Sequence, residues 1–309
     1  MHSHYRVLFS AFALLVSAIP PAHAQYPEPP ESPGPEAWPF LTDLAAPLEW
    51  RFHWTRDTAN ADEISLRGGV RVEANFPDPE GVLETAYQDL DTFFTAASIP
   101  RDGGYRIITE RIPTDTFEAF QITVTDTECR IQANDTEGIR RGVFFLEDEL
   151  LRAEGPFLKP GTTERKPFIR NRISRCFFGP IKREPKFKDE LMDAVDYYPD
   201  NYLNKIAHDG VNGLWLTIEF KDIVQTSLTP VVDPGRDKRL EKLRATVAKC
   251  RRYGIEVFLF CIEPRVMDPD HPLLQAHPEI GSKTSGTGRL FCPFPEAAQK
   301  YLYEAMNDI

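Results

Sequence analysis

The segment "GIEVFLFCIEPR", residues 254–265, is an apolar run that ends on a carboxylate, a proline and an arginine. Its length and apolarity predict a buried strand that Pro264 brings to an end. Side chains alternate along a strand, so Glu263 shares one face with Ile255, Val257, Leu259 and Cys261. We predict that this face lines the inside of a closed parallel barrel, with Glu263 at its mouth and Arg265 opening the rim loop.

Two earlier segments repeat this arrangement. "VNGLWLTIEF", residues 211–220, predicts a strand whose mixed face ends on Glu219. "FIRNRISRCFF", residues 168–178, predicts the first strand of the series, and its small residues indicate that the face carrying Arg172 points inward. Arg175 lies on the opposite face of this strand. Three roles are open to it there: capping a helix, pairing with an acid, or contacting a ligand. Trp215, in mid-strand, is more typical of a core than of a sugar platform.

Strands alternate with helices from residue 168 onward. Helical patterns cover "DNYLNKIAHDG", residues 200–210, which Gly210 brings to an end, as well as Asp237–Tyr253 and the segment that follows Pro295. This alternation predicts a parallel sheet with helices packed outside. The preceding block, 45–155, instead has the order strand, helix, three strands, helix, and predicts a small sheet with both helices on one face. Its first strand is expected around Ile64–Val72, and the last two strands, joined by "DTE", predict a hairpin. Asn134, Asp135 and Thr136 supply capping side chains for its second helix, and 156–167 is expected to be a connection rich in Pro, Gly and Thr. The expected fold class is therefore α/β, with a small α+β accessory domain before a barrel.

The amino terminus and the composition limit the classes of function. Residues 1–24 resemble an export signal that ends on a small-x-small cleavage site, and residues 25–44 form a Pro-rich linker. The net charge of −11 argues against a nucleic-acid partner. The five cysteines contain no CxxC pair, so they do not form a disulfide scaffold, although one disulfide fits an exported chain. No spacing indicates a metal or cofactor, including that of His271 and His277.

Three motifs resemble secreted glycoside hydrolases of family 20, the β-hexosaminidase type. "DTEGIRRGVFFLEDEL" is similar to the last helix of that family's accessory domain, with Asp135, Gly138 and Gly142 in matching positions. "KPFIRNRIS" is similar to its first barrel strand, where an arginine five positions after a proline grips the terminal sugar; Pro167 and Arg172 have that spacing. "YGIEVFLFCIEP" is similar to its third strand.

The resemblance implies an accessory domain at 45–155 and, at 165–309, the first three strand–helix units of a (β/α)8 barrel. Because such a barrel takes about 250 residues, the resemblance implies a truncated barrel. The catalytic Asp-Glu pair of that family follows its fourth strand, so we expect it beyond Ile309. Sugar-holding roles then fall to Arg172, Glu219 and Glu263, with Arg175 and Arg265 as further contacts. The implied protein is a secreted or periplasmic glycosidase acting on O-glycosyl bonds of a carbohydrate.

Other interpretations of the same residues stay open at this point. Glu219 and Glu263 could pair with Arg172 or Arg265 in a structural network, and Arg265 fits a rim salt bridge. The second strand has Glu219 near the position where the family carries an Asp, so a relative such as an α-glucuronidase-like glycosidase also fits. A non-catalytic, exported carbohydrate-binding or interaction protein is the alternative from another class.

Overall fold

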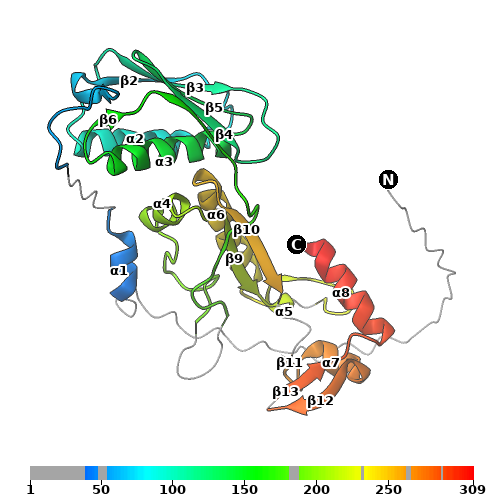
Figure 1. Cartoon of the computed structure of the whole chain (residues 1–309). Coiled ribbons are helices and arrows are strands. Elements are labelled where there is room, and N and C mark those ends of the chain that lie inside the picture. The colour runs from blue at the N-terminus through cyan, green and yellow to red at the C-terminus, as the bar shows by residue number, and fades with distance from the viewer. Residues whose placement is uncertain (1–38, 48–53, 181–187, 231–232, 262–265, 287) are drawn as a thin grey trace.

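The structure is a computed structural model that describes residues 39–47, 54–180, 188–230, 233–261, 266–286 and 288–309. Figure 1 shows a sheet with two helices on one face, and beside it a smaller sheet followed by the carboxyl-terminal elements. The expected signal, residues 1–24, lies outside the described residues. No helix in the described part of the chain combines the length and the apolarity needed to cross a bilayer.

The first sheet has five strands in the order β2-β3-β5-β4-β7. They span Val70–Ala74, Tyr105–Arg111, Glu128–Ala133, Phe120–Val124 and Gly161–Arg165, in that order. β4 and β5 form the predicted antiparallel hairpin, whereas β2 and β3 run parallel. We call this sheet with its two helices the five-stranded unit. A two-stranded pair, β1 (Ile64–Ser65) with β6 (Phe157–Leu158), and the 3-10 turn η2 (Leu66–Gly68) lie at its edge.

Two amphipathic helices, α2 (Glu84–Ala96) and α3 (Thr136–Arg152), pack on one face of this sheet. The Asp135 carboxylate caps α3 by accepting a hydrogen bond from the Gly138 amide at 2.8 Å. Gly138 and Gly142 let α3 lie close to the sheet, because a β-carbon at Gly142 would come within 2.3 Å of the Ile131 side chain. The glycines of the quoted motif therefore have a packing role.

The second sheet has three parallel strands in the order β10-β9-β8. β8 spans Ile173–Arg175, β9 Gly213–Ile218 and β10 Glu256–Cys261. Helices α4 (Asp200–His208), α5 (Phe220–Ile223) and α6 (Arg236–Arg252) follow β8 and β9 along the chain, as the predicted alternation requires. Leu214, Leu216 and Ile218 of β9 are buried toward the core. We call these elements the parallel unit.

The carboxyl-terminal elements were only partly expected. Strands β11 (Val266–Met267), β13 (Gly288–Phe291) and β12 (Gly281–Ser285) form a small antiparallel sheet. Helix α7 (Pro272–Ala276) and the turn η3 (Pro278–Ile280) precede β12. The predicted last helix is α8 (Glu296–Asp308), with Pro295 at its N-cap. This antiparallel insertion escaped the sequence pattern because its strands are short and lie among turn residues.

Three sequence predictions need correction. The Pro-rich linker was extended to residue 44, but α1 (Pro39–Ala45) begins inside it and packs Phe40 against the Phe177 ring at 5.4 Å. The connection at 156–167 contains strand β7, which pairs with β4. The strand expected around Ile64–Val72 divides at its glycine pair, where Gly69 has a φ of +88°.

Candidate functional site

The carboxyl edge of the parallel sheet carries a compact set of charges. β9 ends at Ile218, and Glu219 follows directly as the N-cap of α5. The Lys221 ammonium lies 3.1 Å from the Glu219 carboxylate, and Asp222 is buried beside them. Burial alone would lower the pKa of Lys221, but the Glu219 and Asp222 charges outweigh burial and raise it. Lys221 therefore stays cationic beside the Glu219 carboxylate at the end of β9.

His271 joins this edge from the loop before α7. Its Nδ1 accepts a hydrogen bond from the Leu273 amide at 3.2 Å, while Nε2 is buried without a hydrogen-bond partner among the described residues. Burial, reinforced by the positive charge of Lys221, lowers the pKa of His271 to about 4. The imidazole is therefore neutral at pH 7, with its proton on Nε2.

Glu190 fixes the chain that leaves β8 at the same edge. Its buried carboxylate accepts hydrogen bonds from the Gly179 amide at 3.1 Å, from the Phe178 amide and from the Tyr198 hydroxyl at 2.7 Å. Gly179 has a φ of +64° and lies so close to Thr217 that a β-carbon would come within 2.9 Å of its side chain. The turn after β8 is thus held against the end of β9.

One face of the parallel sheet carries aromatic and cationic side chains. The rings of Trp215 and Phe260 meet edge to face with centroids 4.6 Å apart, and the Arg175 guanidinium lies 5.9 Å from the Trp215 ring. Phe260 is 47% exposed, and Trp215 Nε1 has no hydrogen-bond partner in the described part of the chain. This face offers flat apolar surface beside a cation, leading to the edge that holds Glu219.

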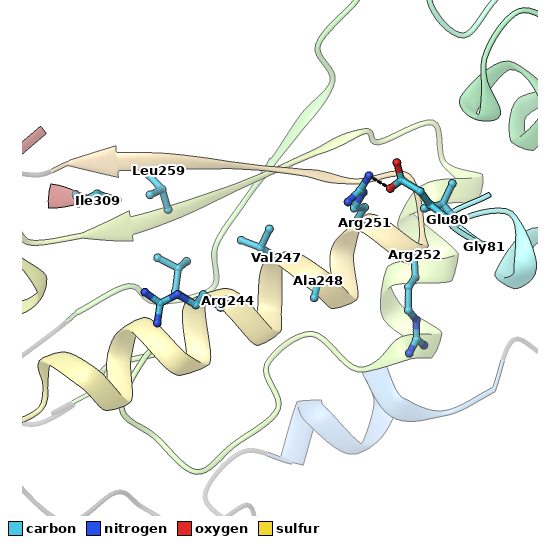
Figure 2. Close-up of a pocket in the computed structure, with 11 residues that line it drawn as sticks. Glu80, Gly81, Arg244, Val247, Ala248, Arg251, Arg252, Leu259 and Ile309 are labelled. Atoms are coloured by element: carbon cyan, nitrogen blue, oxygen red, sulfur yellow. Dashed lines mark hydrogen bonds and ion pairs between the residues drawn. The ribbon is translucent and has the colours of Figure 1, made fainter. Parts of the chain in front are cut away.

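The register of β9 and β10 contradicts the predicted orientation of β10. Trp215 pairs with Phe258, and Leu216 pairs with Leu259. Since paired residues of parallel strands point to the same side, Leu259 shares the face of Leu216. Figure 2 shows Leu259 opposite Val247 of α6, where both line a cavity of about 580 Å³. The row that leads toward Glu263 therefore faces the helix, because the bulky Phe258 and Phe260 occupy the opposite face.

The predicted orientation of β8 is also wrong. Arg175 pairs with Trp215, so Arg175 and not Arg172 lies on the face of Trp215. The alternation of small residues was misleading because Ser174 lies opposite Leu214, on the helix-covered side.

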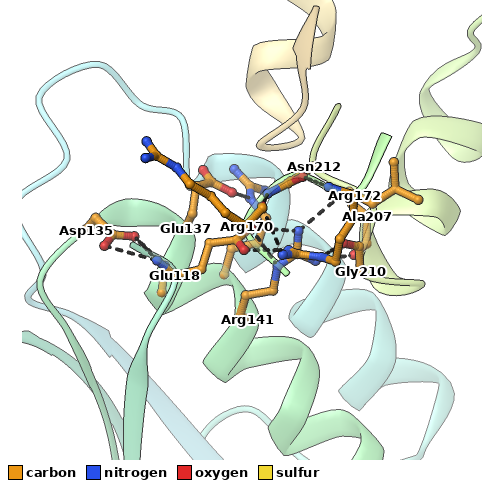
Figure 3. Close-up of polar contacts among 12 residues, drawn as sticks. Glu118, Asp135, Glu137, Arg141, Arg170, Arg172, Ala207, Gly210 and Asn212 are labelled. Carbon is orange, nitrogen blue, oxygen red and sulfur yellow. Dashed lines mark hydrogen bonds and ion pairs between the residues drawn. The ribbon is translucent and has the colours of Figure 1, made fainter. Parts of the chain in front are cut away.

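Arg172 lies at the opposite end of the parallel strands, where they begin. It directly precedes β8, whereas Glu219 directly follows β9, and these strands run parallel with Ile173 opposite Gly213. The Arg172 guanidinium donates to the Glu118 carboxylate and to the carbonyls of Gly210 and Ile169. Figure 3 shows Arg141 and Asn212 converging on Glu118 as well. The predicted convergence of Arg172 with Glu219 therefore fails, and Arg172 holds the two units together.

Two predicted contacts, Glu263 and Arg265, lie outside the described residues. All five cysteines are free thiols, so the disulfide for which the sequence left room is not formed. Lys221, Asp222, Glu190 and a site role for His271 escaped the sequence interpretation. For Lys221 and Asp222 a signal was present, because they directly follow the carboxylate that ends β9. Glu190 and His271 come from distant loops that only the fold brings to this edge.

Comparison with solved structures identifies the fold. A GH138 enzyme that targets pectin rhamnogalacturonan II superposes with a TM-score of 0.54 at 15% identity, over 70% of this chain and 27% of its own. A mutant Streptomyces plicatus β-hexosaminidase in complex with its product GlcNAc gives a TM-score of 0.50 at 15% identity, over 85% of this chain and 58% of its own.

The fold is similar to that of these glycoside hydrolases. It is a mixed α/β fold similar to that of the family 20 β-hexosaminidases, as the sequence motifs indicated. The chain spans less than two thirds of the length of either solved structure. No family model matches the chain, and no curated protein matches it in sequence.

Proposed function

We propose that this chain belongs to a carbohydrate-active glycosidase, with its sugar-holding site at the carboxyl edge of β8, β9 and β10. The observation that carries the proposal is the position of Glu219 directly after β9, because parallel α/β folds bind ligands where their strands end. The glycoside hydrolase fold supports the same edge.

The residues at this edge fit a sugar. The carboxylate of Glu219 can accept hydrogen bonds from hydroxyl groups, and the Lys221 ammonium, 3.1 Å away, can donate to them. Phe260 and Trp215 offer apolar ring faces to the C–H face of a pyranose, and the Arg175 guanidinium beside them donates to ring substituents. The polar groups at the strand ends match the hydroxyl groups of a carbohydrate. The aromatic side chains below them match the apolar C–H face of its ring.

The finer organisation belongs to this proposal. We assign residues 45–155 to an accessory domain and 165–309 to three strand–helix units of a (β/α)8 barrel. We assign residues 1–24 to an export signal, so that the protein acts outside the cytoplasm. The catalytic carboxylate pair is not assigned to any residue of this chain.

Glycan binding by the full chain tests the proposal. We expect a subset of oligosaccharides to bind on an array, and Glu219→Gln to weaken that binding at least tenfold, the cost of one charge-assisted hydrogen bond. Glu241→Gln, an exposed carboxylate on α6, is the matched control and should leave binding unchanged. The absence of any bound glycan would contradict the proposal. Turnover of aryl glycosides by the chain alone would place catalytic groups within it and leave the binding proposal standing.

A further inference from the structure

Three helices bring a metal-binding set of side chains together at the junction of the two units. Asp89 comes from α2, Glu147 from α3 and His208 from α4, and their candidate ligand atoms all lie within 4.8 Å of one another. His208 Nε2 lies 2.5 Å from Asp89 Oδ2 and 3.7 Å from Glu147 Oε2. The chain positions of these residues are too far apart for any sequence motif to reveal them.

The two carboxylates are buried, and no lysine or arginine among the described residues lies beside them. The Glu147 side chain is 1% exposed, and neither of its oxygens has a hydrogen-bond partner among the described residues. Neither Asp89 nor Glu147 forms an ion pair with a lysine or arginine of the described residues. Two buried carboxylates of this kind are costly unless a positive charge lies between them.

The surrounding side chains orient the three groups. The Asn204 amide donates to Asp89 Oδ1 at 2.6 Å, which leaves Oδ2 to face His208. The Phe144 ring stacks on the imidazole with centroids 3.7 Å apart and planes 25° apart. Partners of this kind, which fix the direction of a ligand without touching the ion, are typical of protein metal sites.

We propose that Asp89, Glu147 and His208 bind a divalent transition-metal ion, of which Zn²⁺ fits the donor set best. One imidazole nitrogen and two carboxylate oxygens are ligands that Zn²⁺ accepts, and water completes the tetrahedron. The imidazole disfavours Mg²⁺ and Ca²⁺, which prefer oxygen ligands. Small side-chain movements would widen the 2.5 Å hydrogen bond between His208 and Asp89 to the separation of two ligands on one ion.

A bound ion would join the two units. Asp89 and Glu147 belong to helices of the five-stranded unit, whereas His208 belongs to the parallel unit. The ion would therefore stabilise their relative position at the junction. His208 precedes β9 along the chain, whereas Glu219, proposed to hold sugar, follows it. This inference does not depend on the proposed function.

Zinc titration of the chelator-treated full chain tests the site. We expect one tight Zn²⁺ equivalent and a rise of roughly 4 °C or more in the thermal midpoint, with no such response to Mg²⁺. Glu147→Gln should abolish both effects, and Asn204→Ala should weaken binding about tenfold. Asp148→Asn, an exposed neighbour that pairs with Arg152, removes the same charge and should retain the parental response.

The comparison between variants removes background binding, because His2, His4 and the cysteines are common to all of them. Gln has nearly the same shape as Glu, so we expect Glu147→Gln to fold, as circular dichroism would confirm. If it does not fold, Co²⁺ bound to the parent chain gives the second measurement. An absorption spectrum typical of Co²⁺ with nitrogen and oxygen ligands would support the site. A charge-transfer band from a cysteine thiolate to Co²⁺ would overturn it. An unchanged zinc affinity in folded Glu147→Gln would also overturn it.

Discussion

Arg172 and Glu118 form an ion pair between the parallel unit and the five-stranded unit, across 54 positions of the chain. The Glu118 carboxylate is 1% exposed and also accepts from Arg141 at 3.1 Å and from Asn212. Glu118 has a φ of +64°, an unusual conformation for a residue other than glycine. The residue that the motif assigned to sugar binding is thus engaged at the junction of the two units.

Glu118→Ala should lower the free energy of unfolding by roughly 3 kcal/mol, because it leaves two arginines half-buried without their carboxylate. Urea denaturation measures this loss. Glu149→Ala, which removes an exposed pair with Arg152, is the control and should change stability by less than about 0.5 kcal/mol. Equal effects of the two substitutions would show that the Glu118 network does not stabilise the junction.

His271→Gln should remove a pH-dependent loss of stability. The folded protein keeps this imidazole neutral down to a pKa of about 4, whereas the unfolded chain takes up a proton near pH 6.5. Because the unfolded state binds more protons in that window, the parent protein loses stability as the pH falls from 6.5 to 4, by up to roughly 3 kcal/mol.

Unfolding experiments across this pH range compare the parent chain with the variant. His277→Gln, a substitution in the same region, should keep the parental pH dependence. A parallel pH profile for the parent and His271→Gln would contradict the burial of a neutral imidazole at this edge.

Gly142→Ala should destabilise the protein by about 1–3 kcal/mol, although alanine has the higher helix propensity. The new methyl group would come within 2.3 Å of Ile131 and push α3 away from the sheet. Gly104→Ala, where a β-carbon would have nothing within 4 Å, is the control. Thermal unfolding of both variants distinguishes the two sites, and a neutral or stabilising Gly142→Ala would refute close helix–sheet packing.

The helices and strands follow from local patterns, whereas the site needed contacts that no local pattern contains. The hairpin of β4 and β5, the cap at Asp135 and the strand–helix alternation could all be predicted, because each depends on neighbouring residues. The order of the five-stranded sheet could not, since β7 returns from a segment that resembles a connection.

The faces of the short strands were the least predictable feature. Alternation divides β10 into two sets, but both sets are apolar, so the sequence does not say which one meets α6. The register settles the question by placing Leu259 beside Leu216. Arg172 was misplaced for a related reason: β8 has only three residues, and the arginine lies before the strand instead of at its end.

The most direct test of the sugar site compares the two edges of the parallel sheet by calorimetry with the tightest glycan found on the array. We predict that Glu219→Gln weakens glycan binding at least tenfold. Arg172→Met should reduce stability and leave the glycan affinity within about twofold of the parent. A loss of affinity in folded Arg172→Met, with Glu219→Gln unchanged, would contradict the account and return the site to the opposite edge.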